Sequence, residues 1–138
     1  MRKPRIVLAD DDRDFLQAIQ TLLGSEFEIV ASVGDGYALI EAVAAHKPDL
    51  IVTDISMPLL SGFHAARQLR TDQPSIPIIF LTIREDPTFV AEAQKLGVSG
   101  YVVKRSAASD LMPAIRAVLQ GGSFISADLR RSDQPSDS

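Results

Sequence analysis

Five short apolar runs, separated by segments with helical periodicity, constrain the fold of this chain more than any other feature. The runs are rich in β-branched residues and nearly continuous rather than alternating, which is typical of strands buried on both faces of a parallel sheet. They cover residues 5–9 (RIVLA), 27–32 (FEIVAS), 49–53 (DLIVT), 76–81 (IPIIFL) and 99–103 (SGYVV).

A helix is predicted after each run. Pro113 falls inside the last of these helices, and it removes a backbone donor there. We therefore expect that helix to start late, near Ser109, or to kink. The predicted helices run from Phe15 to Leu23, from a cap at Asp35 to before Pro48, from Gly62 to about Thr71, from Pro87 to about Gly97, and from about Ala107 to Gln120.

The alternation gives five strand–helix units, and right-handed crossovers between parallel strands make this a doubly wound α/β fold with helices on both faces. The chain has 138 residues, enough for one domain with its own core. We assign residues 1–124 to that domain. Residues 125–138 are polar and lack periodicity, so we expect a tail or the start of a linker.

Composition excludes several classes of function. The chain has no cysteine, which rules out disulfides and thiolate chemistry. Its net charge is −4 and no segment is strongly basic, which argues against direct binding to nucleic acid. No apolar run approaches the ~20 residues of a membrane span. We expect a cytoplasmic domain that does not enter a membrane.

Polar side chains follow four of the predicted strands, at the point where each strand ends. They are Asp10 and Asp11, Asp54, Thr82 and Lys104. The carboxyl ends of parallel strands meet at one edge of a sheet, which is where such folds place their sites. A lone aspartate after a strand is more often a helix cap or turn former. Capping does not explain five such residues with complementary chemistry.

The chemistry of this set points to phosphoryl transfer. Three carboxylates in one pocket stay ionised only if a cation joins them, and a hard ion such as Mg²⁺ or Mn²⁺ suits oxygen ligands. Lys104 and Thr82 could stabilise a transferring phosphoryl group. Asp54 stands alone at a central strand end and is the candidate nucleophile, which would become an acyl phosphate. His46 and His64 lie in polar helical contexts and suggest no zinc site.

These motifs, in this order and spacing, resemble the receiver domain of bacterial two-component response regulators. The resemblance covers residues 5 to about 122, and it rests on VLADDD, PDLIVTDISMPLLSG, FLT and GYVVK. It implies a flavodoxin-like fold with strand order 2-1-3-4-5, and a sensor histidine kinase as partner. The roles that it implies are a phosphoacceptor at Asp54, metal ligation by Asp10, Asp11 and the Ser56 backbone carbonyl, a switch hydroxyl on Thr82, phosphate contact by Lys104, and an aromatic switch at Tyr101, which turns inward when Thr82 moves.

The ending GVSGYVVKRSAASDLMPAIRAVLQGGSFIS is similar to receivers of the LuxR/NarL-type subfamily. Such receivers continue through a linker into a helix-turn-helix domain, so we expect DNA contact only through an effector domain absent from this chain, and a homodimer on phosphorylation. The resemblance also implies a phosphoacceptor that assists its own phosphorylation and dephosphorylation, not an enzyme acting on other substrates.

Three positions depart from the commonest receiver pattern. Ile83 stands where many receivers have a small residue, and it could narrow phosphoryl access or slow hydrolysis. Arg105 follows the lysine where many have proline. Asp12 replaces a frequent histidine and could cap the first helix instead of binding metal.

Other classes of function fit less well. A haloacid-dehalogenase-like phosphatase needs a D-x-D-x-T/S motif, and Asp12-Arg13-Asp14-Phe15 lacks the final hydroxyl. A flavodoxin-like cofactor site needs donors in the first loop, where this chain has acids. The remaining alternative is a receiver-like interaction module that works without phosphorylation.

Overall fold

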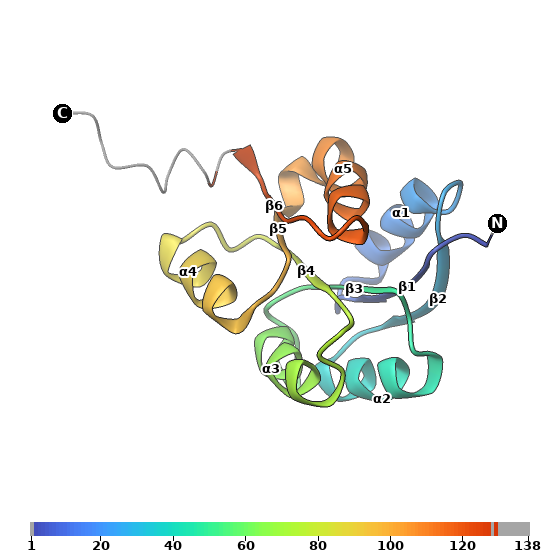
Figure 1. Ribbon diagram of the computed structural model, residues 1–138, viewed down its shortest axis with the longest axis horizontal. Coiled ribbons are helices and arrows are strands. Elements are labelled where there is room, and N and C mark those ends of the chain that lie inside the picture. Colours follow the sequence, from blue (N-terminus) through green and yellow to red (C-terminus); the bar gives the residue numbers. More distant parts are fainter. Residues whose placement is uncertain (1, 128, 130–138) are drawn as a thin grey trace.

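The computed structural model describes residues 2–127 and 129 (Figure 1). Its strands form one parallel sheet in the order β2-β1-β3-β4-β5-β6, which confirms the α/β fold and the order of the first five strands. The strands are β1 (Arg5–Ala9), β2 (Glu28–Val33), β3 (Leu50–Thr53), β4 (Ile78–Thr82), β5 (Gly100–Val103) and β6 (Phe124–Ile125).

Helices cover both faces of the sheet (Figure 1). Helices α2, α3 and α4 pack on one face, and α1 and α5 pack on the other. The helices are α1 (Arg13–Leu23), α2 (Gly36–His46), α3 (Gly62–Asp72), α4 (Pro87–Leu96) and α5 (Ala107–Leu119), with a single 3₁₀ turn, η1 (Lys104–Ser106), before α5.

Alternation along the strands divides the core between the two faces. In β1, Val7 and Ala9 contact the layer of α2, α3 and α4, whereas Ile6 and Leu8 contact the layer of α1 and α5. All of β3 and β4 is buried. Because both faces of these strands need apolar side chains, the sequence shows continuous apolar runs instead of a period of two.

The sixth strand was not predicted. Phe124 pairs with Gly100 and Ile125 with Tyr101, so the chain continues into the sheet across the proposed domain boundary at 124/125. A strand of two residues is too short to produce a periodic signal. Ser126, one residue further on, is fully buried. Most of the expected tail, residues 128 and 130–138, lies outside the described residues.

Short polar side chains begin the first three helices, as the sequence indicated for two of them. Asp12 caps α1 by accepting a hydrogen bond from the Phe15 amide at 3.1 Å. Asp35 does the same for the Ala38 amide in α2, at 2.8 Å. Ser61 caps α3. These caps fix where the chain leaves each loop at the carboxyl edge of the sheet.

The bounds predicted for the last helix, from about Ala107, are confirmed, and the alternative of a late start near Ser109 is wrong. Helix α5 begins at Ala107, directly after η1, and Pro113 lies inside it. Pro113 and Ser109 are both on the exposed side, where water can solvate the carbonyl that loses its donor. The opposite side buries five apolar residues, and this packing holds the helix together: Ala107, Leu111, Ala114, Ile115 and Val118.

The start of α3 packs directly against the end of β3. A Cβ atom on Gly62 would lie only 1.6 Å from the backbone oxygen of Asp54. The Gly62 amide also donates to the Ile55 carbonyl at 2.8 Å. The position of Asp54 therefore depends on having no side chain at residue 62.

In the part of the chain that the structure describes, no helix has the length and apolar character that a membrane span requires.

The close approach predicts a large effect of Gly62→Ala. The added methyl group must displace the backbone of Asp54, so we expect the free energy of unfolding to fall by about 3 kcal/mol or more. Chemical denaturation followed by circular dichroism measures this. Gly34→Ala is the matched control, because its Cβ would meet no atom closer than 3.8 Å. Equal stability of the two variants would contradict the close packing of α3 on β3.

Candidate functional site

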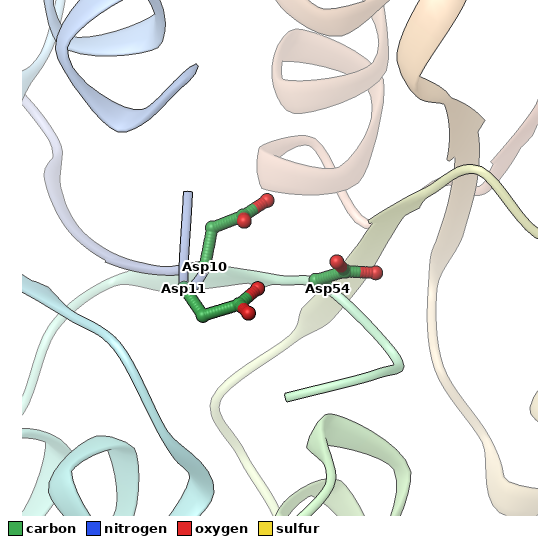
Figure 2. Close-up of side chains that lie close together, drawn as sticks. All are labelled: Asp10, Asp11 and Asp54. Atoms are coloured by element: carbon green, nitrogen blue, oxygen red, sulfur yellow. The ribbon is translucent and has the colours of Figure 1, made fainter. Parts of the chain in front are cut away.

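Three aspartates gather at the carboxyl edge of the sheet (Figure 2). Asp10 and Asp11 follow β1, and Asp54 follows β3, which pairs with β1. One carboxylate oxygen from each lies within 4.8 Å of the others. Asp10 is 3% exposed and Asp54 5% exposed, whereas Asp11 reaches solvent. The sheet therefore brings together the three acids that the sequence placed at separate strand ends.

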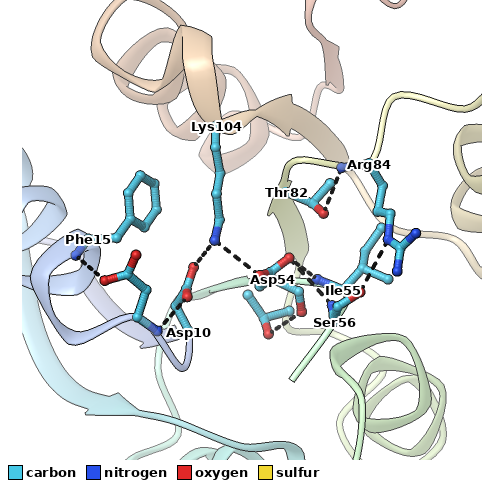
Figure 3. Close-up of polar contacts among 10 residues, drawn as sticks. Asp10, Phe15, Asp54, Ile55, Ser56, Thr82, Arg84 and Lys104 are labelled. Atoms are coloured by element: carbon cyan, nitrogen blue, oxygen red, sulfur yellow. Dashed lines mark hydrogen bonds and ion pairs between the residues drawn. The ribbon is translucent and has the colours of Figure 1, made fainter. Parts of the chain in front are cut away.

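Lys104 joins two of these acids from the end of β5 (Figure 3). Its Nζ atom lies 2.6 Å from Asp10 Oδ2 and 3.1 Å from Asp54 Oδ2. The same ammonium lies 4.6 Å from the centre of the Phe15 ring, within the range of a cation–π contact. Helix α1 and strands β1, β3 and β5 thus all contribute to holding this one side chain.

The charges of the cluster do not balance. Burial raises the pKa of Asp10, and the hydrogen bond from Lys104 only partly offsets this. Burial acts to lower the pKa of Lys104, but hydrogen bonds to Asp10 and Asp54 outweigh it and hold that pKa above its usual value. Lys104 is therefore a cation, and a single ammonium faces three carboxylates. The surplus of oxygen ligands and negative charge suits a hard divalent cation.

Asp54 is oriented by its own loop. Its Oδ1 atom accepts hydrogen bonds from the amides of Ile55, at 2.7 Å, and Ser56, at 3.4 Å. Its Oδ2 atom faces Lys104. A fixed carboxylate beside a cation has the chemistry of an oxygen nucleophile for phosphoryl transfer.

Thr82 lies at the end of β4, and its side chain is fully buried. Its hydroxyl accepts a hydrogen bond from the Arg84 amide at 3.2 Å. The Arg84 side chain crosses to the next loop, where Nε donates to Ser56 Oγ at 3.3 Å (Figure 3). The loops after β3 and β4 are thus connected beside Asp54.

Tyr101 is already turned inward in this structure. The residue is 2% exposed, and its ring meets Phe80 edge to face with the centroids 6.3 Å apart. Its hydroxyl donates to the Arg84 carbonyl at 2.8 Å. Burial raises the pKa of this phenol, which keeps it a donor. The resemblance implied an inward turn on phosphorylation, but here the ring is buried with Thr82 still bonded to Arg84.

The remaining candidates lie outside the cluster. The Ile83 side chain is 71% exposed, so it points to solvent. Asp14 is exposed. Arg105 bonds to Glu85. His64 contacts the cap residue Ser61 at 2.7 Å, which is consistent with a structural role.

Sequence reasoning missed two contacts of Lys104. The second acid partner, Asp10, and the ring of Phe15 both come from the start of the chain, and the successive pairings of β1, β3, β4 and β5 bring them to the same edge as Lys104. Sequence reasoning also missed Ser126, which approaches β5 through β6. The motif GSFIS contained the signal: an apolar pair followed by a small hydroxyl residue.

Comparisons with known proteins agree with this geometry. Residues 6–116 match the response regulator receiver domain family. Transcriptional regulatory protein DegU of Brevibacillus brevis is 37% identical over 125 residues, which cover 89% of this chain and 53% of that protein. Oxygen regulatory protein NreC of Staphylococcus epidermidis is 31% identical over 131 residues, which cover 93% of this chain and 60% of that protein. The chain thus spans about half to three-fifths of these relatives.

Solved structures share the whole fold. A LuxR-family two-component response regulator from Aurantimonas sp. SI85-9A1 superposes with a TM-score of 0.89 at 28% identity, covering 94% of both chains. The isolated REC domain of RcsB from Salmonella enterica serovar Typhimurium, in the presence of phosphomimetic BeF3−, gives a TM-score of 0.87 at 27% identity, covering 94% of this chain and 98% of that one. Sequence, fold and site agree: this chain belongs to the response regulator receiver domain family of two-component systems, and its relatives include LuxR-family regulators.

Proposed function

We propose that this domain accepts a phosphoryl group on Asp54 from a sensor histidine kinase. The observation that carries the proposal is the position of the Asp54 carboxylate, which is held by loop amides on one oxygen and by Lys104 on the other. Asp10, Asp11, Asp54 and the backbone carbonyl of Ser56 would hold Mg²⁺ or Mn²⁺. When bound, that cation offsets the negative charge that gathers as phosphate approaches the carboxylates.

The residues of the chain then have separate tasks. An oxygen of Asp54 forms a bond to phosphorus as the bond from phosphorus to the histidine nitrogen breaks, and the carboxylate becomes an acyl phosphate. Lys104 exchanges its contact with Asp54 for one with a phosphoryl oxygen. The domain is thus a phosphoacceptor that assists its own phosphorylation and later dephosphorylation.

The switch begins at Thr82. Its hydroxyl accepts from the Arg84 amide, and a new phosphoryl group offers it an acceptor to which it can donate instead. The Arg84 carbonyl holds the Tyr101 hydroxyl, so movement of the loop after β4 is transmitted to β5. Phosphorylation would shift the population between two packings of this loop.

The output is proposed from the relatives. DegU is described as a transcriptional regulatory protein, and a solved structure shows two RcsB dimers bound to two parallel DNAs. We propose dimerisation on phosphorylation and control of transcription through a DNA-binding domain outside this chain, in the cytoplasm. The alternative is an interaction module that works without phosphate.

The nucleophile is tested with a small phosphodonor such as acetyl phosphate and Mg²⁺. We expect the parent to gain about 80 Da by intact mass, in an adduct that hydroxylamine removes, because acyl phosphates react with it. Asp54→Asn should gain no such adduct. Asp14→Asn is the matched control, since it changes an exposed acid at the start of α1.

Two outcomes contradict the proposal in different ways. An equal adduct on Asp54→Asn would place the nucleophile elsewhere. A parent that takes no phosphate from acetyl phosphate or from a purified histidine kinase would favour the interaction module.

The metal requirement is tested in the same assay. Removing divalent cations with EDTA should lower the initial rate by about ten-fold or more, and added Mg²⁺ or Mn²⁺ should restore it. Asp11→Asn should raise the Mg²⁺ concentration needed for half-maximal rate, because it removes a carboxylate but leaves Asp54 and Lys104 in place. A rate that EDTA does not change would show that Lys104 alone neutralises the site.

A further inference from the structure

Ser126 connects the end of the described chain to the site. It is fully buried, and it makes three hydrogen bonds at the edge of β5. Its amide donates to the Tyr101 carbonyl at 3.0 Å. Its Oγ atom accepts from the Val103 amide at 3.1 Å and donates to Asp110 Oδ2 at 2.8 Å.

The hydroxyl replaces strand pairing that β6 is too short to supply. Strand β6 pairs only with Gly100 and Tyr101, yet Val103 is 1% exposed, so its amide needs an acceptor inside the protein. The Ser126 side chain provides one. Ser126 therefore provides hydrogen-bond partners for two backbone groups of β5. Its amide donates to the Tyr101 carbonyl, and its hydroxyl accepts from the Val103 amide.

The same hydroxyl bonds to residues on both sides of the turn that contains Lys104. Val103 is the last residue of β5 and directly precedes Lys104. Asp110 lies in the first turn of α5, beyond η1. Because Ser126 Oγ bonds to both, the turn between them is held at its start and at its end. The Lys104 side chain begins inside that turn and reaches Asp54 at 3.1 Å.

We propose that Ser126, oriented by Asp110, is a positioning residue for Lys104 in phosphoryl transfer. This rests on the proposed function of Asp54. It acts through the path Ser126–Val103–Lys104–Asp54, and it makes the segment after β6 part of the phosphoacceptor unit. Phosphorylation and the anchoring of this segment are then coupled, and the coupling is reciprocal.

The first test is kinetic. Ser126→Ala should lower the initial rate of phosphorylation by acetyl phosphate roughly three- to ten-fold, because a displaced Lys104 ammonium is no longer placed to bond to a phosphoryl oxygen. Ser126→Thr keeps the hydroxyl and should recover most of the rate. Ser123→Ala is the matched control: it removes an exposed hydroxyl from the same segment and should leave the rate unchanged.

A double-mutant cycle separates positioning from general loss of structure. If Ser126 acts through Lys104, Ser126→Ala should have no further effect on the rate in a Lys104→Met background. The same fold-loss with and without Lys104 would overturn the proposal. Should Ser126→Ala fail to fold, as judged by circular dichroism, Asp110→Asn enters the cycle in its place, because it weakens the same hydroxyl contact from the half-buried Asp110 side chain in the first turn of α5.

The second test needs no phosphate, so it distinguishes failure of this inference from failure of the proposed function. Lys104 lies over the Phe15 ring, and the ring current shifts the ε-methylene proton resonances of Lys104 upfield. In Ser126→Ala these resonances should move toward ordinary lysine values, and in Ser126→Thr and Ser123→Ala they should stay. Unchanged resonances in folded Ser126→Ala would disprove the positioning role, whether or not Asp54 accepts phosphate.

Discussion

The burial of carboxylates at adjacent strand ends is the constraint on which the site depends. Asp10 and Asp54 are both almost excluded from water at adjacent strand ends, and burial raises the pKa of Asp10. Lys104 relieves part of this by bonding to both. The relief requires β1, β3 and β5 to end at the same level, so the site and the parallel register of the sheet depend on each other. The negative charge that Lys104 leaves uncompensated suits a hard divalent cation.

Sequence reasoning recovered the fold because the fold is periodic. Continuous apolar runs predicted buried parallel strands, and polar residues at four strand ends predicted one shared edge. Strands β3 and β4, buried throughout, meet this rule most fully. The acids were found because their position is a property of each strand end taken separately. Their chemical roles belong to the proposed function, because the position of a carboxylate at a strand end does not by itself determine its chemistry.

The features that sequence reasoning missed depend on single contacts between distant residues. The alternative of a late start for α5 was wrong because the packing of its buried side outweighs the bond lost at Pro113. The contact of Gly62 with the Asp54 backbone, and the inward position of Tyr101 beneath the Arg84 carbonyl, carry no periodic signal. Each is decided by geometry at one point, and the local sequence is compatible with other arrangements.

The C-terminal end of the sheet, formed by β6 and Ser126, is another feature that hydrophobic periodicity did not predict. Hydrophobic periodicity stops near Gly121, yet the backbone pairing continues through Ile125 and the buried hydroxyl of Ser126. The residues that close the sheet are thus the first residues of what looked like a tail. The segment after β6 is bonded through Ser126 to Val103, the residue next to Lys104, so the positioning role proposed for Ser126 would link the acidic cluster to this segment through β5 alone.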